Sequence, residues 1–138
     1  MPDTNPDILN LLIVDDEPYL GEIYEGEFEE EVNAGHLRLR SFTGVTDCLQ
    51  ELDTLKGTAQ IVIISDLHMP GLSGIDLLER TRDFQGNLDI YICSGSGLSS
   101  EREAALSYGA AGLLPKPIDL FKLRQMLVEK YGLHSLAS

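Results

Sequence analysis

Five short apolar runs alternate along the chain with segments whose apolar residues recur at helical spacing. The first run, residues 8–14, is almost continuously apolar, which is typical of a strand buried on both faces of a sheet. Residues 37–42 alternate apolar and polar side chains and predict a strand with one wetter face, at a sheet edge. Three shorter runs complete the five predicted strands, at residues 61–64, 90–93 and 113–114.

Five helices are predicted between and after these strands, over residues 19–30, 45–55, 75–81, 100–108 and 120–131. The first is marked by an apolar set at helical spacing: Leu20, Ile23, Tyr24 and Phe28. Ser100 with Glu103 predicts a capping box at the start of the fourth helix. Asp119 is the predicted N-cap of the last helix, whose inward residues are expected to be Leu120, Leu123, Leu127 and Val128.

This alternation of strands and helices predicts an α/β fold, in which a parallel sheet is covered by helices on both faces. A chain of 138 residues has room for one such domain. We expect it to span residues 8–131, with an N-terminal extension of residues 1–7 and a C-terminal tail of residues 132–138. Ligands of such sheets bind beyond the carboxyl ends of the strands, so the chemistry is expected directly after the predicted strands.

Net charge and composition narrow the range of partners and compartments. With 23 acidic and 10 basic residues the formal charge is −13, which disfavours direct binding to nucleic acid or anionic membranes. One acidic run is expected to be a solvated helix face, with a docking surface for a basic partner as the alternative: Glu22, Glu25, Glu27, Glu29, Glu30 and Glu31. No apolar stretch approaches the ~20 residues of a membrane span, and no signal-peptide pattern or disulfide spacing is present, so we predict a cytoplasmic protein without membrane insertion.

Polar side chains stand where four of the predicted strands end. Asp15 and Asp16 follow the first strand, Asp66 the third, Ser94 the fourth and Lys116 the fifth. Each of these residues alone is weak evidence for a functional site, because such residues are common in turns. Together they are informative, because a parallel sheet brings the carboxyl ends of its strands to one edge.

Three carboxylates at that edge would repel one another and therefore imply a bound cation. Oxygen ligands without histidine or cysteine favour a hard ion, and Mg²⁺ with part of its shell supplied by water or phosphate is expected. Lys116 offers a compact positive charge for a phosphate oxygen, and Ser94 offers a hydroxyl donor. Because a carboxylate can itself attack phosphorus, one of the three aspartates is expected to be the nucleophile.

These segments, in this order and spacing, resemble the receiver domains of two-component signalling over about residues 8–131. The matching segments are L-I-V-D-D-E-P at 12–18, D-L-H-M-P-G-L-S-G at 66–74, C-S-G at 93–95, G-A at 109–110 and K-P at 116–117. The resemblance implies a flavodoxin-like (CheY-like), doubly wound sheet of five parallel strands in the order 2-1-3-4-5, with five helices. It also implies that the protein is no enzyme beyond assisting its own phosphorylation and dephosphorylation.

By the same resemblance, Asp66 is the phosphoacceptor and takes its phosphoryl group from a phosphohistidine of a sensor histidine kinase or a histidine phosphotransfer protein. The implied ligands of Mg²⁺ are Asp15, Asp16, Asp66 and the backbone carbonyl of His68. Ser94 would hydrogen-bond the phosphoryl group, and Lys116 would pair with it beside a cis peptide bond to Pro117. The surface formed by the last two helices and the strand between them would then change, and a downstream protein target is expected to dock there.

One position departs from the family pattern. Receivers usually carry Tyr or Phe three residues before the lysine, and here that position holds Leu113, so the aromatic part of the switch is missing or altered. Tyr91 and Tyr108 are nearby in sequence, and we expect core or surface roles for them. His68 is expected to be an exposed side chain at the mouth of the site, a position that tunes acyl-phosphate hydrolysis in similar domains.

Three other interpretations stay open on the sequence. A Mg²⁺-dependent phosphohydrolase of the dehalogenase-like class usually has a second aspartate two residues after the nucleophile, and here those positions hold Glu17, Pro18 and His68. The chain could also be the receiver portion of a longer regulator. Finally, it could be a receiver-like fold that binds partners constitutively, without phosphorylation.

Overall fold

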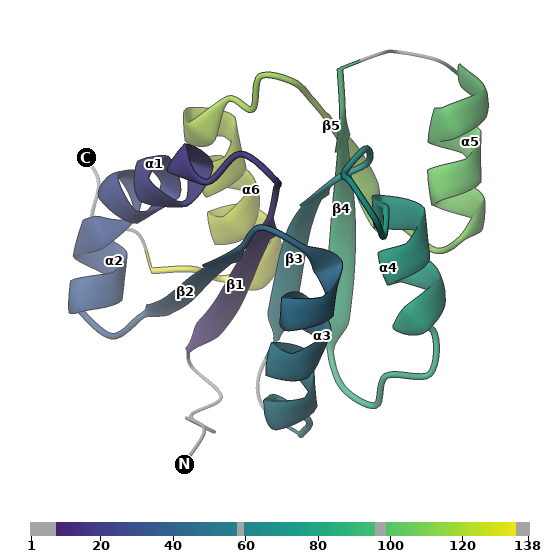
Figure 1. The fold of residues 1–138 in the computed structure, drawn as a ribbon. Coiled ribbons are helices and arrows are strands. Elements are labelled where there is room, and N and C mark those ends of the chain that lie inside the picture. Colours follow the sequence, from purple (N-terminus) through teal and green to yellow (C-terminus); the bar gives the residue numbers. More distant parts are fainter. Residues whose placement is uncertain (1–7, 58–59, 96–98, 135–138) are drawn as a thin grey trace.

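The computed structural model describes residues 8–57, 60–95 and 99–134. Its centre is a five-stranded parallel sheet in the order β2-β1-β3-β4-β5 (Figure 1). The strands are β1 (Leu9–Val14), β2 (Leu37–Phe42), β3 (Ile61–Asp66), β4 (Leu88–Ser94) and β5 (Gly112–Pro115). The predicted strand order and the edge position of β2 are confirmed. The predicted extension, residues 1–7, and the end of the predicted tail, residues 135–138, lie outside the described residues.

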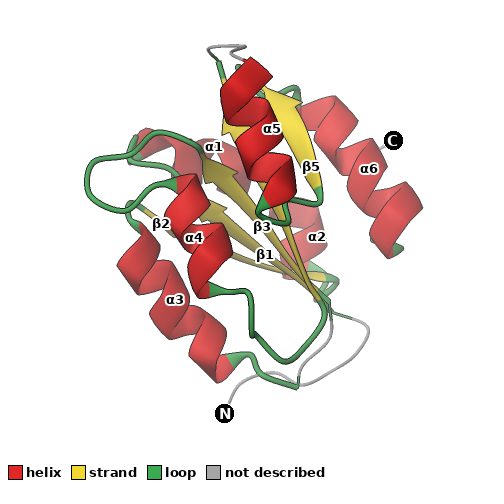
Figure 2. Ribbon diagram, turned by 90° about the vertical axis from the view of Figure 1, so that its right-hand side faces the viewer, coloured by secondary structure: helices red, strands yellow, loops and turns green. Residues whose placement is uncertain are grey.

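Within the described ranges, helices cover both faces of the sheet. They are α1 (Tyr19–Glu27), α2 (Glu29–Asn33), α3 (Val45–Thr54), α4 (Gly74–Arg80), α5 (Ser99–Ser107) and α6 (Leu120–Tyr131). Helices α1 and α6 lie on one face, and α3, α4 and α5 lie on the other (Figures 1 and 2). Among these helices none is long and apolar enough to cross a membrane.

The two faces of the sheet bury two separate hydrophobic clusters. In β1, Leu12 and Val14 belong to the cluster under α3, α4 and α5, whereas Leu11 and Ile13 belong to the cluster under α1 and α6. Successive side chains of a strand point to opposite faces, so a strand covered on both sides must be apolar throughout. This explains why the first apolar run is continuous.

The first predicted helix is divided in two, which makes six helices where five were expected. The break lies at Phe28, whose φ of −106° and ψ of 15° depart from helical values. Its N–H still donates to the carbonyl of Tyr24, and its own carbonyl accepts from Val32. Phe28 is fully buried, and Arg124 of α6 stacks on its ring and donates to the backbone carbonyl of Glu27. Tertiary contacts with α6 therefore stabilise the break.

Two capping predictions have opposite outcomes. Asp119 caps α6, because its side chain accepts from the N–H of Lys122, as predicted. Ser100 is not the N-cap of α5, since that helix begins at Ser99. A complete capping box is found instead at α4, where Ser73 and Asp76 each accept from the backbone N–H of the other.

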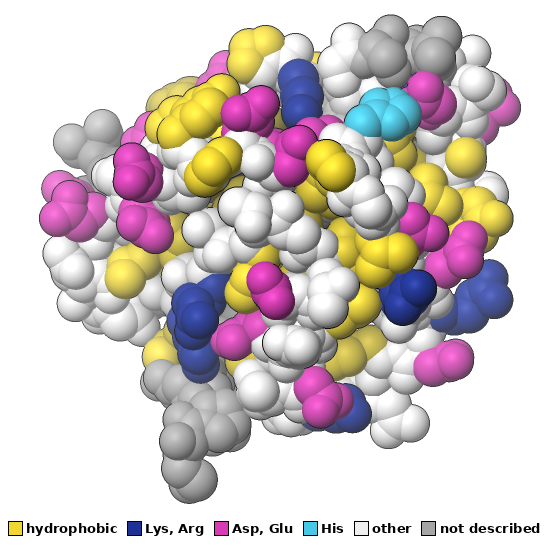
Figure 3. All heavy atoms as spheres, viewed as in Figure 1, with side chains coloured by type: hydrophobic (Ala, Val, Ile, Leu, Met, Phe, Trp, Pro, Cys, Tyr) yellow, Lys and Arg dark blue, Asp and Glu magenta, His cyan; other side chains and the backbone are white. Residues whose placement is uncertain are grey.

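Several side-chain placements also differ from the predictions. Val128, expected to point inward, is exposed, and so is Ile23 of the apolar set on α1. The acidic run on α1 and α2 is solvated, as Figure 3 shows at the left, with one exception. Glu31 is completely buried and lies against Arg124, with Oε2 at 3.3 Å from Nε. Packing also continues past α6, because Leu133, in the predicted tail, is buried.

Candidate functional site

The strands of the sheet end together, and this brings the predicted site residues to one edge. Val14 pairs with Ser65, so Asp15 and Asp66, the residues that follow each of them, emerge side by side. Asp66 in turn pairs with Cys93, the residue before Ser94. Because the register is parallel throughout, the gathering of these residues is a consequence of strand pairing, as the sequence predicted.

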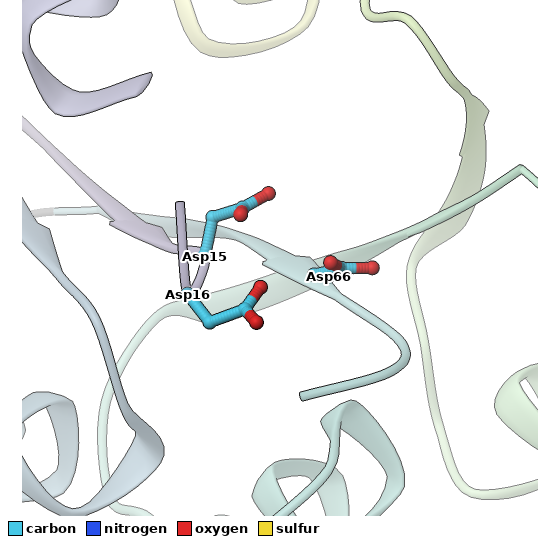
Figure 4. Close-up of side chains that lie close together, drawn as sticks. All are labelled: Asp15, Asp16 and Asp66. Carbon is cyan, nitrogen blue, oxygen red and sulfur yellow. The ribbon is translucent and has the colours of Figure 1, made fainter. Parts of the chain in front are cut away.

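Three carboxylates meet at this edge. Oxygen atoms of Asp15, Asp16 and Asp66 lie within 4.8 Å of one another (Figure 4). Asp15 and Asp66 are buried, and Asp16 is exposed to solvent. A set of carboxylate oxygens with one open side fits a hard divalent cation that keeps several water ligands, as Mg²⁺ does. The fourth predicted ligand, the backbone carbonyl of His68, stays a prediction.

Burial and mutual repulsion make full ionisation of this cluster unfavourable without a cation. The pKa of Asp15 is raised, mainly by burial and further by the negative charges of Asp66 and Asp16. A hydrogen bond from the N–H of Glu17 to Asp15 Oδ1, 2.9 Å long, and the charge of Lys116 act in the opposite direction without cancelling the rise. A divalent ion would remove this cost, so the residues present fit the expected metal.

Lys116 supplies the positive charge nearest to the cluster. Its Nζ lies 2.7 Å from Asp66 Oδ2 and 3.9 Å from Asp15 Oδ2. Burial of Lys116 opposes its charge, but the hydrogen bond to Asp66 outweighs this and raises its pKa. The peptide bond from Lys116 to Pro117 is cis, as the family resemblance implied. Lys116 therefore stays charged and points at the predicted nucleophile.

Ser94 and the start of α4 complete the surroundings of Asp66. Ser94 is the last residue of β4, is half-buried and pairs in register with Pro115, directly before Lys116. On the other side, a Cβ at Gly74 would lie 2.8 Å from the backbone carbonyl of Asp66, so only glycine fits there. The first turn of α4 is thus held directly against the end of β3.

One contact at the site was missed by the sequence analysis. His68, whose side chain is 67% exposed as predicted, has its Nε2 2.5 Å from Oε2 of Glu101 in the first turn of α5. The backbone N–H of His68 donates to Asp66 Oδ1 at 3.4 Å. Glu101 lies 33 residues further along the chain, and no spacing rule connects it to His68.

A cleft of about 510 Å³ opens next to the carboxylates, between α1 and the segment that leads from β5 into α6. Its lining joins the charged residues Asp15, Asp66 and Lys116 to apolar side chains that include Tyr19 and Ile23. The carboxylate site is therefore bordered on one side by apolar side chains.

Tyr91 and Tyr108 have the core and surface positions expected of them. Tyr91 is buried, and its hydroxyl bonds to that of Tyr131 at 2.8 Å, whereas Tyr108 is exposed at the end of α5. Leu113 is partly buried and packs against the cluster under α3, α4 and α5. Cys93 is buried, and its burial raises the pKa of its thiol to about 12.

Comparisons with known proteins agree with this geometry. The model of the response regulator receiver domain family matches residues 11–128. The putative two-component response regulator ARR21 of Arabidopsis thaliana is 32% identical over 122 residues, which cover 85% of this chain and 18% of that protein. The transcriptional regulatory protein FixJ of Bradyrhizobium diazoefficiens is 37% identical over 87 residues, 61% of this chain and 42% of that protein. This chain thus spans less than half of the length of these relatives.

Solved structures show the same fold. The receiver domain of the Saccharomyces cerevisiae response regulator Ssk1, crystallised with the histidine phosphotransfer protein Ypd1, superimposes with a TM-score of 0.73 at 21% identity, covering 89% of this chain and 88% of that one. Full-length FixJ from B. japonicum superimposes with a TM-score of 0.68 at 28% identity, covering 87% of this chain and 56% of that one.

Proposed function

The chain belongs to the response-regulator receiver family, and we propose that Asp66 is its phosphoacceptor, which makes the domain a phosphorylation switch. One observation carries this assignment. Among the three clustered aspartates, Asp66 is the one that Lys116 contacts at 2.7 Å, so the carboxylate and the cation that would hold a phosphoryl oxygen already face each other.

The proposed reaction transfers a phosphoryl group from the imidazole nitrogen of a phosphohistidine to Asp66. An oxygen of the Asp66 carboxylate forms a bond to phosphorus, the P–N bond breaks, and its electron pair returns to the donor imidazole. Lys116 pairs with the incoming phosphoryl oxygens, and the Ser94 hydroxyl donates to one of them. The Mg²⁺ ligands would be Asp15, Asp16, Asp66 and the backbone carbonyl of His68, and the ion would offset the negative charge that accumulates there.

The apolar side of the cleft supports a docking site for the phosphodonor next to Asp66. Tyr19 and Ile23 on α1 line the cleft and are 56% and 47% exposed. Large apolar side chains grouped beside a reactive carboxylate favour a protein ligand, and a histidine kinase or histidine phosphotransfer protein is the donor we propose. The complex of the Ssk1 receiver domain with a phosphotransfer protein supports this choice.

We further propose that the phosphorylated domain binds a downstream protein through the face formed by α5, β5 and α6. The net charge of −13 makes direct nucleic-acid binding by this chain unfavourable. We expect no catalytic activity beyond phosphorylation and dephosphorylation of the domain itself. We also assign it to the cytoplasm, since Cys48 and Cys93 are both free thiols in a fold that buries them.

Intact-mass spectrometry tests the proposal. The chain is incubated with Mg²⁺ and acetyl phosphate, in parallel with Asp66→Asn and with a chelator-treated sample. The expected result is one phosphoryl adduct that hydroxylamine removes and that is missing from both controls. An adduct that persists in Asp66→Asn would disprove the assignment of the acceptor.

Two competing functions give different results in the same assay. A phosphohydrolase would turn over a generic phosphate ester continuously, but His68 occupies the position where that class usually has its second aspartate, and the family match does not favour it. A constitutive binding module would form no adduct with acetyl phosphate or with any phosphohistidine donor.

A further inference from the structure

The His68–Glu101 contact joins two segments that the proposed function treats as separate. His68 lies in the loop after β3, two residues from Asp66, and its backbone N–H faces Asp66 Oδ1. Glu101 lies in the first turn of α5, on the face where a downstream protein is proposed to bind. A side-chain hydrogen bond 2.5 Å long therefore connects the loop beside Asp66 with the face formed by α5, β5 and α6.

This contact is of interest because the aromatic residue expected to connect the phosphorylation site with the face of α5, β5 and α6 is missing. Leu113 has no ring that could move between the site and the face of α5, β5 and α6. In the described part of the chain, the His68–Glu101 contact is the one side-chain hydrogen bond between the loop after β3 and α5.

We propose that Glu101 is a positioning residue, which binds the His68 imidazole to α5 while Asp66 is unmodified. When Asp66 is phosphorylated, the imidazole leaves Glu101 and hydrogen-bonds the phosphoryl group. This inference rests on the proposed function. The His68 imidazole thus exchanges hydrogen-bond partners, from Glu101 in the unmodified protein to a phosphoryl oxygen in the phosphorylated protein.

Charge and exposure support such an exchange. Phosphorylation replaces the single negative charge of the Asp66 carboxylate with nearly two on the phosphoryl oxygens, in a site that already holds the carboxylates of Asp15 and Asp16, with Lys116 as the counter-charge. The His68 side chain is mostly exposed, so it can rotate without displacing core residues. Its present partner, Glu101, is 25% exposed, and a bond in that environment is weak enough to be replaced.

The exchange has a chemical consequence for the lifetime of the acyl phosphate. In hydrolysis, a water oxygen bonds to phosphorus, the bond from phosphorus to the Asp66 oxygen breaks, and the carboxylate leaves with the electron pair while water loses a proton to solvent. A His68 imidazole that hydrogen-bonds the phosphoryl oxygens stabilises the reactant and covers one approach to phosphorus. Removing its competitor, Glu101, should therefore lengthen the lifetime.

A double-mutant cycle on the lifetime of the phosphorylated protein tests the proposal. The half-life of the Asp66 adduct is measured after removal of acetyl phosphate for the native chain, Glu101→Gln, His68→Asn and the double variant. We expect Glu101→Gln to lengthen the half-life about two- to fivefold, the range set by one partly exposed side-chain hydrogen bond, and to have no effect in the His68→Asn background. The same change in both backgrounds, or no change in either, overturns the inference.

Two control variants separate positioning from a general effect of charge on α5. Glu103→Gln removes the same charge from an exposed position two residues away in the same helix, and should leave the half-life unchanged. Glu101→Asp keeps the carboxylate and should restore at least part of the native value. If Glu103→Gln acts as strongly as Glu101→Gln, the effect is electrostatic and the proposal fails.

Backbone amide chemical shifts of α5, measured by NMR, distinguish this exchange from a purely structural role of Glu101. Unphosphorylated Glu101→Gln should show amide shifts in residues 99–103 displaced toward those of the phosphorylated native chain. Displacement in an unrelated direction overturns the exchange. If the adduct forms normally but the cycle is additive, this inference alone fails, whereas the absence of any adduct refutes the proposed function and the inference with it.

Discussion

Replacing Asp15 by asparagine should make the metal-free protein more stable and at the same time abolish its stabilisation by Mg²⁺. Asp15 contributes one of the three carboxylates at the strand ends and is buried. Asparagine retains the oxygen that accepts from the N–H of Glu17, so the local turn is kept. The substitution therefore removes the charge and little else.

The size of the effect follows from the distances. Two unit charges 4.8 Å apart, the limit for the three carboxylates, interact with about 0.9 kcal/mol in water and about 3.5 kcal/mol at an effective dielectric constant of about 20. Asp15 is repelled by Asp16 and Asp66 and attracted by Lys116 at 3.9 Å, which leaves roughly one uncompensated repulsion. In the presence of a chelator, we expect Asp15→Asn to raise the free energy of unfolding by about 1–3 kcal/mol. Each kcal/mol should raise the Tm by about 3–5 °C.

The effect should depend on pH in a defined direction. The pKa of Asp15 is raised in the native state, so folding favours its protonated form. Below the unfolded pKa of 3.8 the carboxyl group is protonated in both states, and the cost of an ionised Asp15 in the folded protein is absent. As the pH rises from there through the native pKa, the native chain loses this stability. The advantage of Asp15→Asn should accordingly grow from near zero at acidic pH to a constant value at neutral pH.

Thermal unfolding followed by circular dichroism measures these differences, with and without Mg²⁺. Mg²⁺ at a hundredfold excess over its Kd should stabilise the native chain by about 2.7 kcal/mol and leave Asp15→Asn unchanged. Glu25→Gln, an exposed substitution on α1 that also removes one negative charge, is the matched control and should respond to Mg²⁺ like the native chain. A variant that is less stable in chelator, or that still gains stability from Mg²⁺, would refute the reasoning.

Two further predictions concern the packing of α1 and α2. Arg124→Met should lower the free energy of urea unfolding by about 3–5 kcal/mol, because it leaves the carboxylate of Glu31 buried without its cation. A loss below about 1 kcal/mol, as is typical of a solvent-exposed ion pair, would contradict this. Gly21→Ala should destabilise by about 1–3 kcal/mol, since its Cβ would lie 2.3 Å from Ser41 Oγ. Gly26→Ala, in the same helix with nothing within 4 Å, should instead stabilise by about 0.4–1 kcal/mol, and equal effects of the two glycine variants would show that the packing difference is not real.

The order of elements and the main site residues could be predicted because their signals are local. An apolar run such as residues 8–14 indicates a strand covered on both faces, and Asp66 stands where such a strand ends. Parallel pairing then fixes which edge these residues share, so the meeting of Asp15, Asp66 and Lys116 follows from topology.

Two of the predictions that failed depend on partners distant in sequence. Glu31 is similar to its acidic neighbours in the sequence and differs only because Arg124, 93 residues further along, lies over it in the fold. The division of α1 from α2 at Phe28 has the same origin, as the same arginine contacts the Phe28 ring and the preceding carbonyl.

The sequence by itself thus determined which residues end the strands and what chemistry those residues can perform. Only the tertiary structure decided which charges are buried, which apolar side chains of α1 are exposed beside the cleft, and that His68 contacts Glu101. The physical reason is that hydrophobic periodicity and capping act within a few residues, whereas burial and ion pairing depend on the packing of segments that the chain brings together from far apart.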